Sequence, residues 1–458
     1  MQQKNQKELA SVRESRGEAP MAQTGGTEVF ATLGVDESPS EHARLMEDIC
    51  RAENVKEAMR KVIANKGSAG VDGMTVDELP EYLKHNWLSI RQELLEGRYE
   101  PQPVKRVEIP KPTGGVRKLG IPTVKDRFIQ QAVLQILQPE WDRTFSEYSY
   151  GFRPGRNARQ AVAKAQEYIQ QGYGWVVDID LEKFFDRVNH DMLMSRVAKR
   201  VGDKRVVRLI RSYLNSGVLE DGLVKTVEEG TPQGGPLSPL LSNLFLDELD
   251  RELEKRGHRF VRYADDSNIY VRSQRAGERV MASITKFITK KLKLKVNESK
   301  SAVAQPQNRK LLGFSFTWGS TPKRRLAPQT VERFKSKVRR LTLRRKGFSV
   351  GTIEPLKRYL RGWIGYFGYC QTPSVVGRLE EWMRRRLRAN IWKQWKHGPT
   401  RFAELRKLGI GKDLAAQTAG SAHGPWRIGW SPAMQMAFSK AYFTSLGIPD
   451  FAGCVSLN

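Results

Sequence analysis

Two adjacent aspartates, Asp265 and Asp266, stand in a segment whose composition predicts a buried β-hairpin. β-branched and aromatic residues precede and follow them over 260–271, and the two acids fall where a tight turn is expected. Acids in a turn are ordinarily solvated turn formers. Here the apolar flanks predict burial, and a buried pair of carboxylates repels itself unless cations lie beside it. A rigid turn of this kind suits Mg²⁺ held against phosphate oxygens, and it calls for a third carboxylate on another strand.

Asp178 and Asp180 are the candidates for that third carboxylate. Residues 175–179 have the apolar character of a buried strand, and alternation places both acids on one face, with Val177 on the other. Two acids projecting from an apolar strand are costly without a partner. They could instead cap a helix expected from Leu181, or pair with nearby Arg or Lys. The aspartate pair in the same chain favours a cation site.

Three motifs in a fixed order give the chain a resemblance to a known family. Asp-x-x-x-Phe-Phe-Asp begins at Asp180, Thr-Pro-Gln-Gly-Gly-Pro-Leu-Ser-Pro spans 231–239, and Tyr-Ala-Asp-Asp spans 263–266. This is the motif order of reverse transcriptases. Gly-Phe-Arg-Pro-Gly-Arg-Asn at 151–157 and Arg-Gly-Trp-Ile-Gly-Tyr-Phe at 361–367 narrow the match. With them the chain resembles bacterial group II intron reverse transcriptase/maturases, most like the class C type that lacks an endonuclease domain.

The resemblance implies an α+β fold of the right-hand polymerase type, with fingers, a palm built on an antiparallel sheet, and a helical thumb. It runs from about Glu41, after a polar leader whose 4 Lys/Arg and 6 Asp/Glu predict disorder. The expected domains are the leader over 1–40, an N-terminal extension and fingers over 41–170, a palm over 171–318 with some finger elements interleaved, a thumb or maturase (X) domain over 319–412, and a small DNA-binding (D-like) region over 413–458.

The charge of the chain points to a polyanionic partner. Its 458 residues include 78 Lys+Arg and 50 Asp+Glu, a formal net charge of +28, which favours nucleic acid over the alternative of a membrane surface. A mean hydropathy of -0.54 and the lack of a long apolar run exclude a spanning helix. Three widely spaced cysteines exclude a Cys-based zinc module and fit a reducing compartment. We therefore expect a cytoplasmic, nucleoid-associated bacterial protein.

The resemblance implies that Asp180, Asp265 and Asp266 are the catalytic residues and hold two Mg²⁺ ions. It adds the backbone carbonyl of Leu181 as a further metal ligand. Asp180 and Asp265 are the more direct ligands, because adjacent residues on a strand diverge and carry Asp266 further away. The implied reaction is in-line nucleotidyl transfer from a dNTP to the 3′-OH of a primer.

A basic hairpin is predicted at 106–122, around a Gly-rich turn. The resemblance puts three cations where the fingers hold the incoming triphosphate, with a solvated hairpin as the alternative: Lys105, Lys111 and Arg117. It also places Phe185 under the deoxyribose, where a ring excludes a 2′-OH, although a core phenylalanine is the alternative. Gln233 would contact the nucleotide or the template base.

The segment 320–412 carries 25 Lys/Arg against 5 Asp/Glu. Its run from Arg384 to Arg388 contains no acid, unlike a typical solvated helix face, and we interpret the segment as a three-helix thumb along an RNA–DNA duplex and intron RNA. Local carbonyls are alternative partners for the two arginines of the 151–157 loop. The candidate nucleic-acid contacts are Arg153, Arg156, Lys300, Arg384, Arg385, Arg386 and Arg388.

Two further patterns predict structure rather than chemistry. A helix expected over 239–253 carries three acids that we interpret as a solvated face or a salt-bridge set: Asp247, Glu248 and Asp250. An aromatic stripe at helical spacing is interpreted as core rather than as a base-stacking surface: Tyr359, Trp363 and Tyr366.

The expected function is an RNA-directed DNA polymerase encoded by a group II intron, acting also as a maturase that binds intron RNA to promote its splicing and mobility. The expected partners are intron RNA, an RNA template/DNA primer duplex, dNTPs and target DNA, with no membrane. One alternative is a domesticated reverse transcriptase of a defence system or a diversity-generating element, against which the basic segment and the 361–367 motif argue. Another is a non-catalytic RNA-binding splicing factor, against which the intact aspartates argue.

Overall fold

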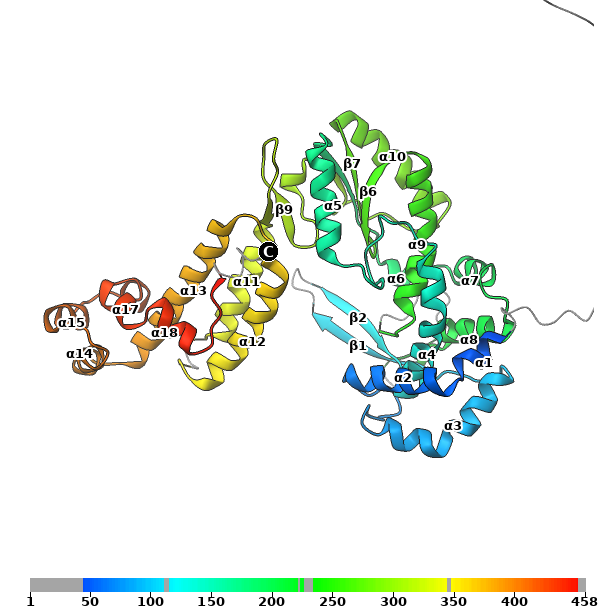
Figure 1. The fold of residues 1–458 in the computed structure, drawn as a ribbon, viewed down its shortest axis with the longest axis horizontal. Helices are drawn as coiled ribbons and strands as arrows, with labels where there is room; N and C mark the ends of the chain where they lie inside the picture. The colour runs from blue at the N-terminus through cyan, green and yellow to red at the C-terminus, as the bar shows by residue number, and fades with distance from the viewer. Residues whose placement is uncertain (1–43, 111–114, 221–222, 226–233, 344–346, 452–458) are drawn as a thin grey trace, which may run out of the picture. The chain divides into compact units, whose positions relative to one another are not determined.

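The computed structural model describes residues 44–110, 115–220, 223–225, 234–343 and 347–451 (Figure 1). Lys111, Gln233 and the leader over 1–40 lie outside the described residues. Within them, helices and two four-stranded sheets build the α+β fold that the sequence predicts. None of the described helices has the length and apolar character needed to cross a bilayer.

One sheet, which we call the palm sheet, has the strand order β6-β7-β3-β8. β6 (Arg259–Tyr263) and β7 (Asp266–Val271) pair antiparallel and form the predicted hairpin. β3 (Trp175–Ile179) has the bounds expected from its apolar residues, and it pairs antiparallel with both β7 and β8 (Ala302–Ala304). β3 is therefore a central strand, which explains its nearly continuous apolar character.

Helices cover both faces of the palm sheet (Figure 1). On one face α5 (Ala158–Gln170) packs against side chains that include Val176. On the opposite face α9 (Ser238–Lys255) and α10 (Gln274–Lys290) pack against side chains that include Val177. The alternation along β3 thus divides the protein into two hydrophobic clusters, one on each side of the sheet.

The second sheet, which we call the fingers sheet, has the order β2-β1-β4-β5. β1 (Val104–Pro110) and β2 (Val116–Ile121) pair antiparallel and confirm the predicted basic hairpin. β1 also pairs parallel with β4 (Val218–Glu220), which in turn pairs with β5 (Leu223–Lys225). The fingers sheet therefore joins two segments that are far apart in the sequence.

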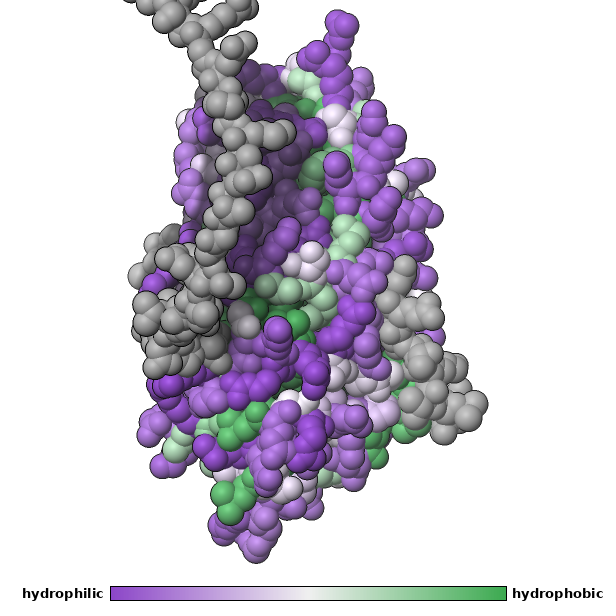
Figure 2. All heavy atoms as spheres, turned by 90° about the vertical axis from the view of Figure 1, so that its right-hand side faces the viewer, coloured by the Kyte–Doolittle hydropathy of each residue, from purple (hydrophilic) through white to green (hydrophobic). Residues whose placement is uncertain are grey.

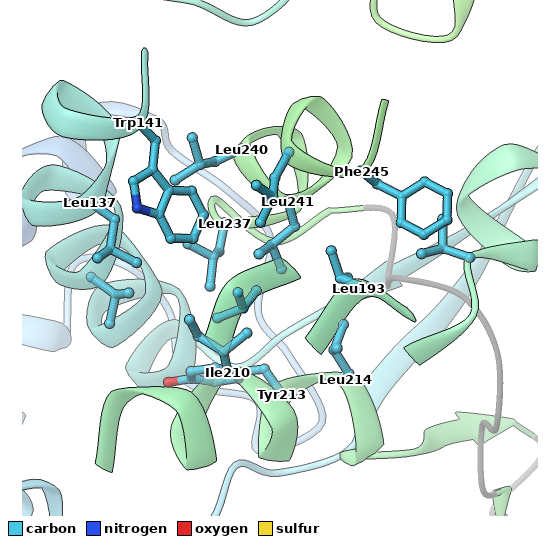
Figure 3. Close-up of a cluster of buried hydrophobic side chains, with 14 of the residues drawn as sticks. Leu137, Trp141, Leu193, Ile210, Tyr213, Leu214, Leu237, Leu240, Leu241 and Phe245 are labelled. Carbon is cyan, nitrogen blue, oxygen red and sulfur yellow. The ribbon is translucent and has the colours of Figure 1, made fainter. Parts of the chain in front are cut away.

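A buried cluster joins the base of the fingers to the palm (Figure 3). Helix α4 (Val124–Asp142) contributes Leu137 and the fully buried Trp141 to this cluster. The leucines of α9 enter the same cluster. The other helices of this half are α1 (Leu45–Ile49), α2 (Ala52–Ala64), α3 (Leu79–Leu95), α6 (Phe184–Arg187), α7 (His190–Ala198) and α8 (Lys204–Asn215).

The chain after the palm is mostly helical. β9 (Phe314–Phe316) and β10 (Arg324–Leu326) pair antiparallel and lead into three longer helices, α11 (Pro328–Leu341), α12 (Val350–Phe367) and α13 (Pro373–Gln394). We call α11–α13 the thumb helices. The smaller elements are η2 (Pro306–Asn308), α14 (Gly398–Lys407), α15 (Lys412–Ala419), α16 (Pro425–Ile428), α17 (Pro432–Ala437) and α18 (Lys440–Ser445).

Aromatic side chains hold the thumb helices together. Trp363 of α12 is buried, and its ring lies 4.6 Å from the ring of Phe334 on α11 and 5.9 Å from that of Phe451. Tyr359 and Tyr366 of the same stripe are half-buried. The interpretation of this stripe as core is therefore confirmed. The face of the molecule in Figure 2 is mostly hydrophilic, with small and separate hydrophobic patches.

Candidate active site and nucleic-acid interface

The three predicted catalytic aspartates come from two neighbouring strands of the palm sheet. Asp180 follows β3 directly, Asp265 lies in the turn between β6 and β7, and Asp266 begins β7. Ile179 is paired with Ser267 across the sheet, so the chain directions bring Asp180 beside Asp266. Two short-range features of the backbone, a strand end and a hairpin turn, thus gather carboxylates from distant parts of the sequence.

The pKa values of Asp265 and Asp266 are raised, mainly because burial reduces their hydration and further because neighbouring carboxylates repel them. Loss of hydration, followed by repulsion from Asp265, Asp178 and Asp180, raises the pKa of Asp266 to about 7. Burial also raises the pKa of Asp265, and the Asp180 charge adds to that effect. A divalent cation would relieve this repulsion, which is the arrangement expected of a metal-binding carboxylate cluster.

Two of the three aspartates, Asp180 and Asp266, border a cavity of about 300 Å³. Its lining includes Asp178, Asp180, Asp266, Asn268, Lys300 and Arg309. Hard oxygen donors of this kind suit Mg²⁺, so the chemistry of the donor set fits a divalent cation. Among the residues that the structure describes, however, no three acidic, His or Cys side chains converge closely enough to hold a metal ion as they stand.

Asp178 is neutralised by an arginine that sequence reasoning missed. Arg309 donates to its carboxylate through Nη2 at 2.6 Å and Nε at 2.9 Å, and Asn268 donates at 3.2 Å. Burial raises the pKa of Asp178, while the Arg309 charge opposes that rise. Asp178 thus follows the alternative that was considered for both strand acids, which is pairing with a nearby arginine or lysine. No spacing or motif connects residues 178 and 309.

A short loop after α10 holds the end of β3. Asn297 donates its backbone N–H to the carbonyl of Asp180 at 2.8 Å, and Asp180 donates its own N–H to Ser301 Oγ at 3.0 Å. Lys300 places its Nζ 3.4 Å from the Asp180 carboxylate. The Lys300 side chain is mostly exposed, so this ion pair is weak. Lys300 therefore lies at the carboxylate site, and its contact with a primer stays a prediction.

A buried network fixes the turn between β6 and β7, which we call the catalytic turn because it carries Asp265, a predicted catalytic residue. Arg262 and Asp250, both without solvent exposure, form a bidentate ion pair with N–O distances of 2.7 and 2.5 Å. The remaining guanidinium nitrogen of Arg262 donates to the Ala264 carbonyl at 2.9 Å and to Asn243 at 3.0 Å. Asn243 donates in turn to the Gly151 carbonyl at 2.9 Å. The network ties α9, the turn before Asp265 and the 151–157 loop into one unit.

This network corrects the interpretation of the α9 acids. The prediction of a salt-bridge set holds, since Asp250 pairs with Arg262, Glu248 with Arg196, and Asp247 with Arg200. The prediction of a solvated face is wrong for Asp250 and Asp247, which are buried. Sequence spacing could not separate them, because three acids within four residues of a helix can face either solvent or a buried arginine of another element.

Two of the predicted nucleotide-binding residues are exposed on the fingers sheet. Arg117 lies opposite Ile109 in the hairpin, close enough to Asp265 that its charge lowers the pKa of that carboxyl against the effect of burial. Lys105 is exposed further along the hairpin, opposite Ile121. The structure thus brings Arg117 to the carboxylates, whereas Lys105 lies at the far end of the strand pair.

Phe185 and the glycine after Gln233 are each described by their immediate neighbours. Phe185 is half-buried, and its ring meets the buried Phe184 edge-on at 5.2 Å. A partly open ring is compatible with both readings, a sugar contact and a core residue. Gly234 has a φ of 144°, and a Cβ there would collide with the carbonyl of Gly120 in β2. This close approach explains why the motif needs glycine at that position.

The two arginines of the 151–157 loop are held by protein groups. Arg153 is buried, forms an ion pair with Asp142 at 2.7 Å and donates to the Ser149 carbonyl at 2.9 Å. Arg156 donates to the Glu147 carbonyl at 2.6 Å. This geometry agrees with the alternative role considered for the two arginines, which is to bind local carbonyls. Arg153 has no accessible guanidinium for a phosphate, which contradicts its proposed nucleic-acid contact.

Arg384 and Arg388 of α13 are held by other parts of the protein. Arg384 forms an ion pair with Glu380 one turn earlier. Arg388 is buried and donates to the Phe438 carbonyl at 2.9 Å. Burial, together with the neighbouring Arg384 charge, lowers the pKa of Arg388 to about 10. The buried guanidinium of Arg388 is engaged within the protein, which argues against its predicted contact with RNA phosphates, whereas the contact of the partly exposed Arg384 stays a prediction.

Arg385 and Arg386 are also occupied. Arg385 donates to the Trp426 carbonyl at 2.9 Å and lies 4.4 Å from the centroid of that ring. Arg386 donates to Thr342 Oγ1 at 2.6 Å. The acid-free run that predicted an RNA-binding face instead supplies cross-links between helices. Within the described thumb helices, arginines that are exposed and make no polar contact include Arg333, Arg340 and Arg378.

Charge reversal should separate these two sets of arginines. We expect Arg386→Glu/Arg388→Glu to lower the thermal stability sharply. The variant loses the hydrogen bonds that both arginines donate, and it puts a carboxylate without a partner at the buried position 388. Arg333→Glu/Arg340→Glu should leave the melting temperature nearly unchanged while weakening RNA binding. For each phosphate that the variant no longer neutralises, the slope of log affinity against log salt should fall by about 0.7–0.9. Equal salt slopes for the exposed-pair variant and the unmodified protein would remove α11 from the interface.

Asp266→Asn should stabilise the metal-free protein at pH 8. The pKa of this carboxyl is 3.8 in an ordinary setting and about 7 in the folded protein. The stability that the protonated carboxyl contributes is therefore fully present below pH 3.8 and is lost as the pH rises through about 7, because the folded protein must then hold an unfavourable charge. Protein atoms crowd the Asp266 carboxyl and reduce its hydration, but the residue stays open to solvent, which screens its charge, so we expect a gain of only about 1 kcal/mol. Thermal unfolding at pH 5 and pH 8, with and without Mg²⁺, measures the effect.

The control for this experiment is Asp191→Asn, which alters an exposed acid away from the cavity. At pH 8, Mg²⁺ should raise the melting temperatures of the unmodified protein and of the control. The rise should be much smaller for Asp266→Asn. A full Mg²⁺ response in Asp266→Asn would contradict a metal site that includes this carboxylate.

Comparison with known proteins agrees with this geometry. Residues 109–316 match the reverse transcriptase (RNA-dependent DNA polymerase) family, and residues 331–409 match the maturase-specific domain of group II introns. The first match includes the hairpin of the palm sheet and all three aspartates. The second includes the greater part of the thumb helices.

Three curated relatives place these domains in context. Protein YkfC of Escherichia coli (strain K12) is 39% identical over 46% of this chain and 58% of YkfC. The group II intron-encoded protein LtrA of Lactococcus lactis subsp. cremoris is 35% identical over 45% of this chain and 35% of LtrA. Nuclear intron maturase 2, mitochondrial, of Arabidopsis thaliana is 31% identical over 30% of this chain and 24% of that protein. The chain thus spans less than two thirds of each relative.

Residues 109–316 of the chain form a reverse transcriptase-family domain, with the mixed α and β polymerase fold of that class. The chain also carries the group II intron maturase-specific domain and is homologous to intron-encoded proteins. A reverse transcriptase domain depends in general on divalent metal ions and acts on nucleic acid.

Proposed function

We propose that this protein is an RNA-directed DNA polymerase encoded by a group II intron, and that it also acts as a maturase for intron RNA. The observation that supports the polymerase role best is that Asp180, Asp265 and Asp266 lie near enough for their charges to repel one another, with the charges of Arg117 and Lys300 also near Asp265. Crowded carboxylates on a rigid sheet, faced by cations from other elements, are the arrangement that nucleotidyl transfer requires.

We assign the roles at the site as follows. The three aspartates, with the Leu181 carbonyl, would hold two Mg²⁺ ions, which when bound supply charge stabilisation for in-line displacement. Arg117 would neutralise the triphosphate of a dNTP. Lys105 and Lys111 would assist from the same hairpin, Gln233 would contact the base, and Phe185 would exclude a 2′-OH.

The maturase role is supported by charge and by domain content. The exposed arginines of α11 and α13 lie in the segment that matches the group II maturase-specific domain. The chain would bind its intron RNA through phosphate contacts, with affinity that falls steeply with salt. The RNA template/DNA primer duplex and target DNA are the further partners that this function requires.

Primer extension on an RNA template tests the polymerase role. We expect Mg²⁺-dependent DNA synthesis from dNTPs, and little extension when rNTPs replace them. EDTA should abolish synthesis, and added Mg²⁺ should restore it. Well-folded protein that binds intron RNA tightly but extends no primer would instead support the alternative of a non-catalytic splicing factor.

A further inference from the structure

Phe152 combines an unfavourable backbone with an exposed ring. Its φ is 58°, in the left-handed region that favours glycine, and 51% of the residue is open to solvent. A bulky residue with such a φ persists only where the surrounding structure over-determines it. Packing does not explain why a phenylalanine occupies this position, because much of its ring is not buried.

The contacts around Phe152 fix it to the catalytic turn. The preceding Gly151 lies against the turn so closely that a Cβ would collide with the backbone nitrogen of Ala264. Asn243 holds the Gly151 carbonyl, and Arg262 holds both Asn243 and the Ala264 carbonyl. Ala264 itself has a φ of 57°. One buried network therefore supports two left-handed residues, and Phe152 cannot move independently of the turn.

The ring of Phe152 lies beside the ring of Tyr263. Their centroids are 6.3 Å apart, with an angle of 46° between the ring planes. Tyr263 is half-buried and ends β6, two residues before Asp265. The exposed phenyl ring is thus backed by a second aromatic ring and held next to the carboxylates that would bind the reacting end of a nucleic acid.

We propose that Phe152, backed by Tyr263, is a stacking platform for a nucleobase of the nucleic acid whose end lies at Asp265. This inference rests on the proposed polymerase function, because that function brings a primer terminus to this turn. Every base presents a flat face, so an exposed aromatic ring can bind successive nucleotides without regard to sequence. A polymerase needs this tolerance, and it needs the ring to be rigid with respect to the carboxylates.

Two substitutions test the platform in the full-length chain. Phe152→Gly removes the ring and suits the left-handed backbone, whereas Phe152→Tyr keeps an aromatic face. Leu88→Ala is the matched control, because Leu88 is 81% exposed and its loss measures the general effect of removing a surface apolar side chain. Affinity for an RNA-template/DNA-primer duplex would be measured by fluorescence anisotropy, with 2-aminopurine placed at successive positions near the primer end.

We expect Phe152→Gly to bind the duplex roughly 5- to 150-fold more weakly, the range that loss of one base–aromatic stack produces. Its melting temperature should stay within about 2 °C of the unmodified protein or rise, since glycine relieves the backbone. One 2-aminopurine position should lose its fluorescence change on binding. Phe152→Tyr and Leu88→Ala should bind nearly as tightly as the unmodified protein.

Unchanged duplex affinity in Phe152→Gly, together with unchanged 2-aminopurine signals at all positions, would overturn the platform. Weaker binding accompanied by a large fall in melting temperature would also overturn it, because the ring would then be structural. Duplex binding is measured without catalysis, so the two proposals fail separately. A protein that makes no DNA in primer extension would refute the polymerase proposal. The affinity of Phe152→Gly for the duplex would still show whether Phe152 binds a base.

Discussion

Replacing Asp265 with Asn should lower the rate of primer extension by at least about 1,000-fold, and Asp180→Asn should have a similar effect. Such a loss corresponds to roughly 4 kcal/mol or more of transition-state stabilisation. Both substitutions keep the shape of the side chain and remove the charge that a cation requires. Single-turnover extension with saturating duplex and dNTP measures the chemical step rather than binding.

The same variants should remain folded, which makes the result interpretable. Burial and the Asp180 charge raise the pKa of Asp265, so removing its charge relieves repulsion rather than breaking a stabilising interaction. We therefore expect an unchanged or higher melting temperature. The exposed Asp191→Asn serves as the control and should extend primers at the normal rate. Activity within tenfold of normal for Asp265→Asn would refute the assignment of the active site.

Asp250→Asn should destabilise the protein by about 3–5 kcal/mol, the largest stability effect expected of a single substitution in the palm. The change leaves the Arg262 guanidinium charged, fully buried and without its counter-ion. Glu248→Gln is the matched control, because Glu248 lies on the same helix and forms an exposed pair with Arg196. Its loss should cost no more than about 1 kcal/mol. Chemical denaturation followed by circular dichroism measures both.

A double substitution separates charge burial from shape. Asp250→Leu/Arg262→Met removes both charges together, and it should recover much of the stability that Asp250→Asn loses. It should not recover activity, because the Ala264 carbonyl and Asn243 would lose the donor that holds the catalytic turn. Equal stability of Asp250→Asn and Glu248→Gln would contradict the role assigned to the buried pair.

The elements that sequence predicts well are those with a strong local signal. Residues 175–179 and the hairpin around Asp265 form strands because their apolar and β-branched residues fit a buried sheet, and Asn157 begins α5 with a capping box. The order of motifs then identified the family. The same local signals placed the three aspartates, since a strand end and a turn fix their positions.

Sequence could not predict which charged residues are occupied. The arginines of α13 looked free because no acid lies within their run, yet their partners include backbone carbonyls and ring faces from distant segments, such as Phe438 and Trp426. Arg309 likewise pairs with Asp178, from which it is 131 positions away in the sequence. Carbonyl groups are present at every residue and leave no trace in composition, so only the fold reveals these pairs.

The parallel pairing of β1 with β4 has a consequence for how the chain folds. Val104 is paired with Val218, and between them the chain forms α4, α5 and the first strand of the palm sheet. Closing a loop of this length is entropically expensive and slow compared with local helix formation. During synthesis, β1 must therefore wait with one edge unpaired until β4 has been made. Nascent chains that stop before β4 would present an open strand edge, which is a site for association between unfinished copies.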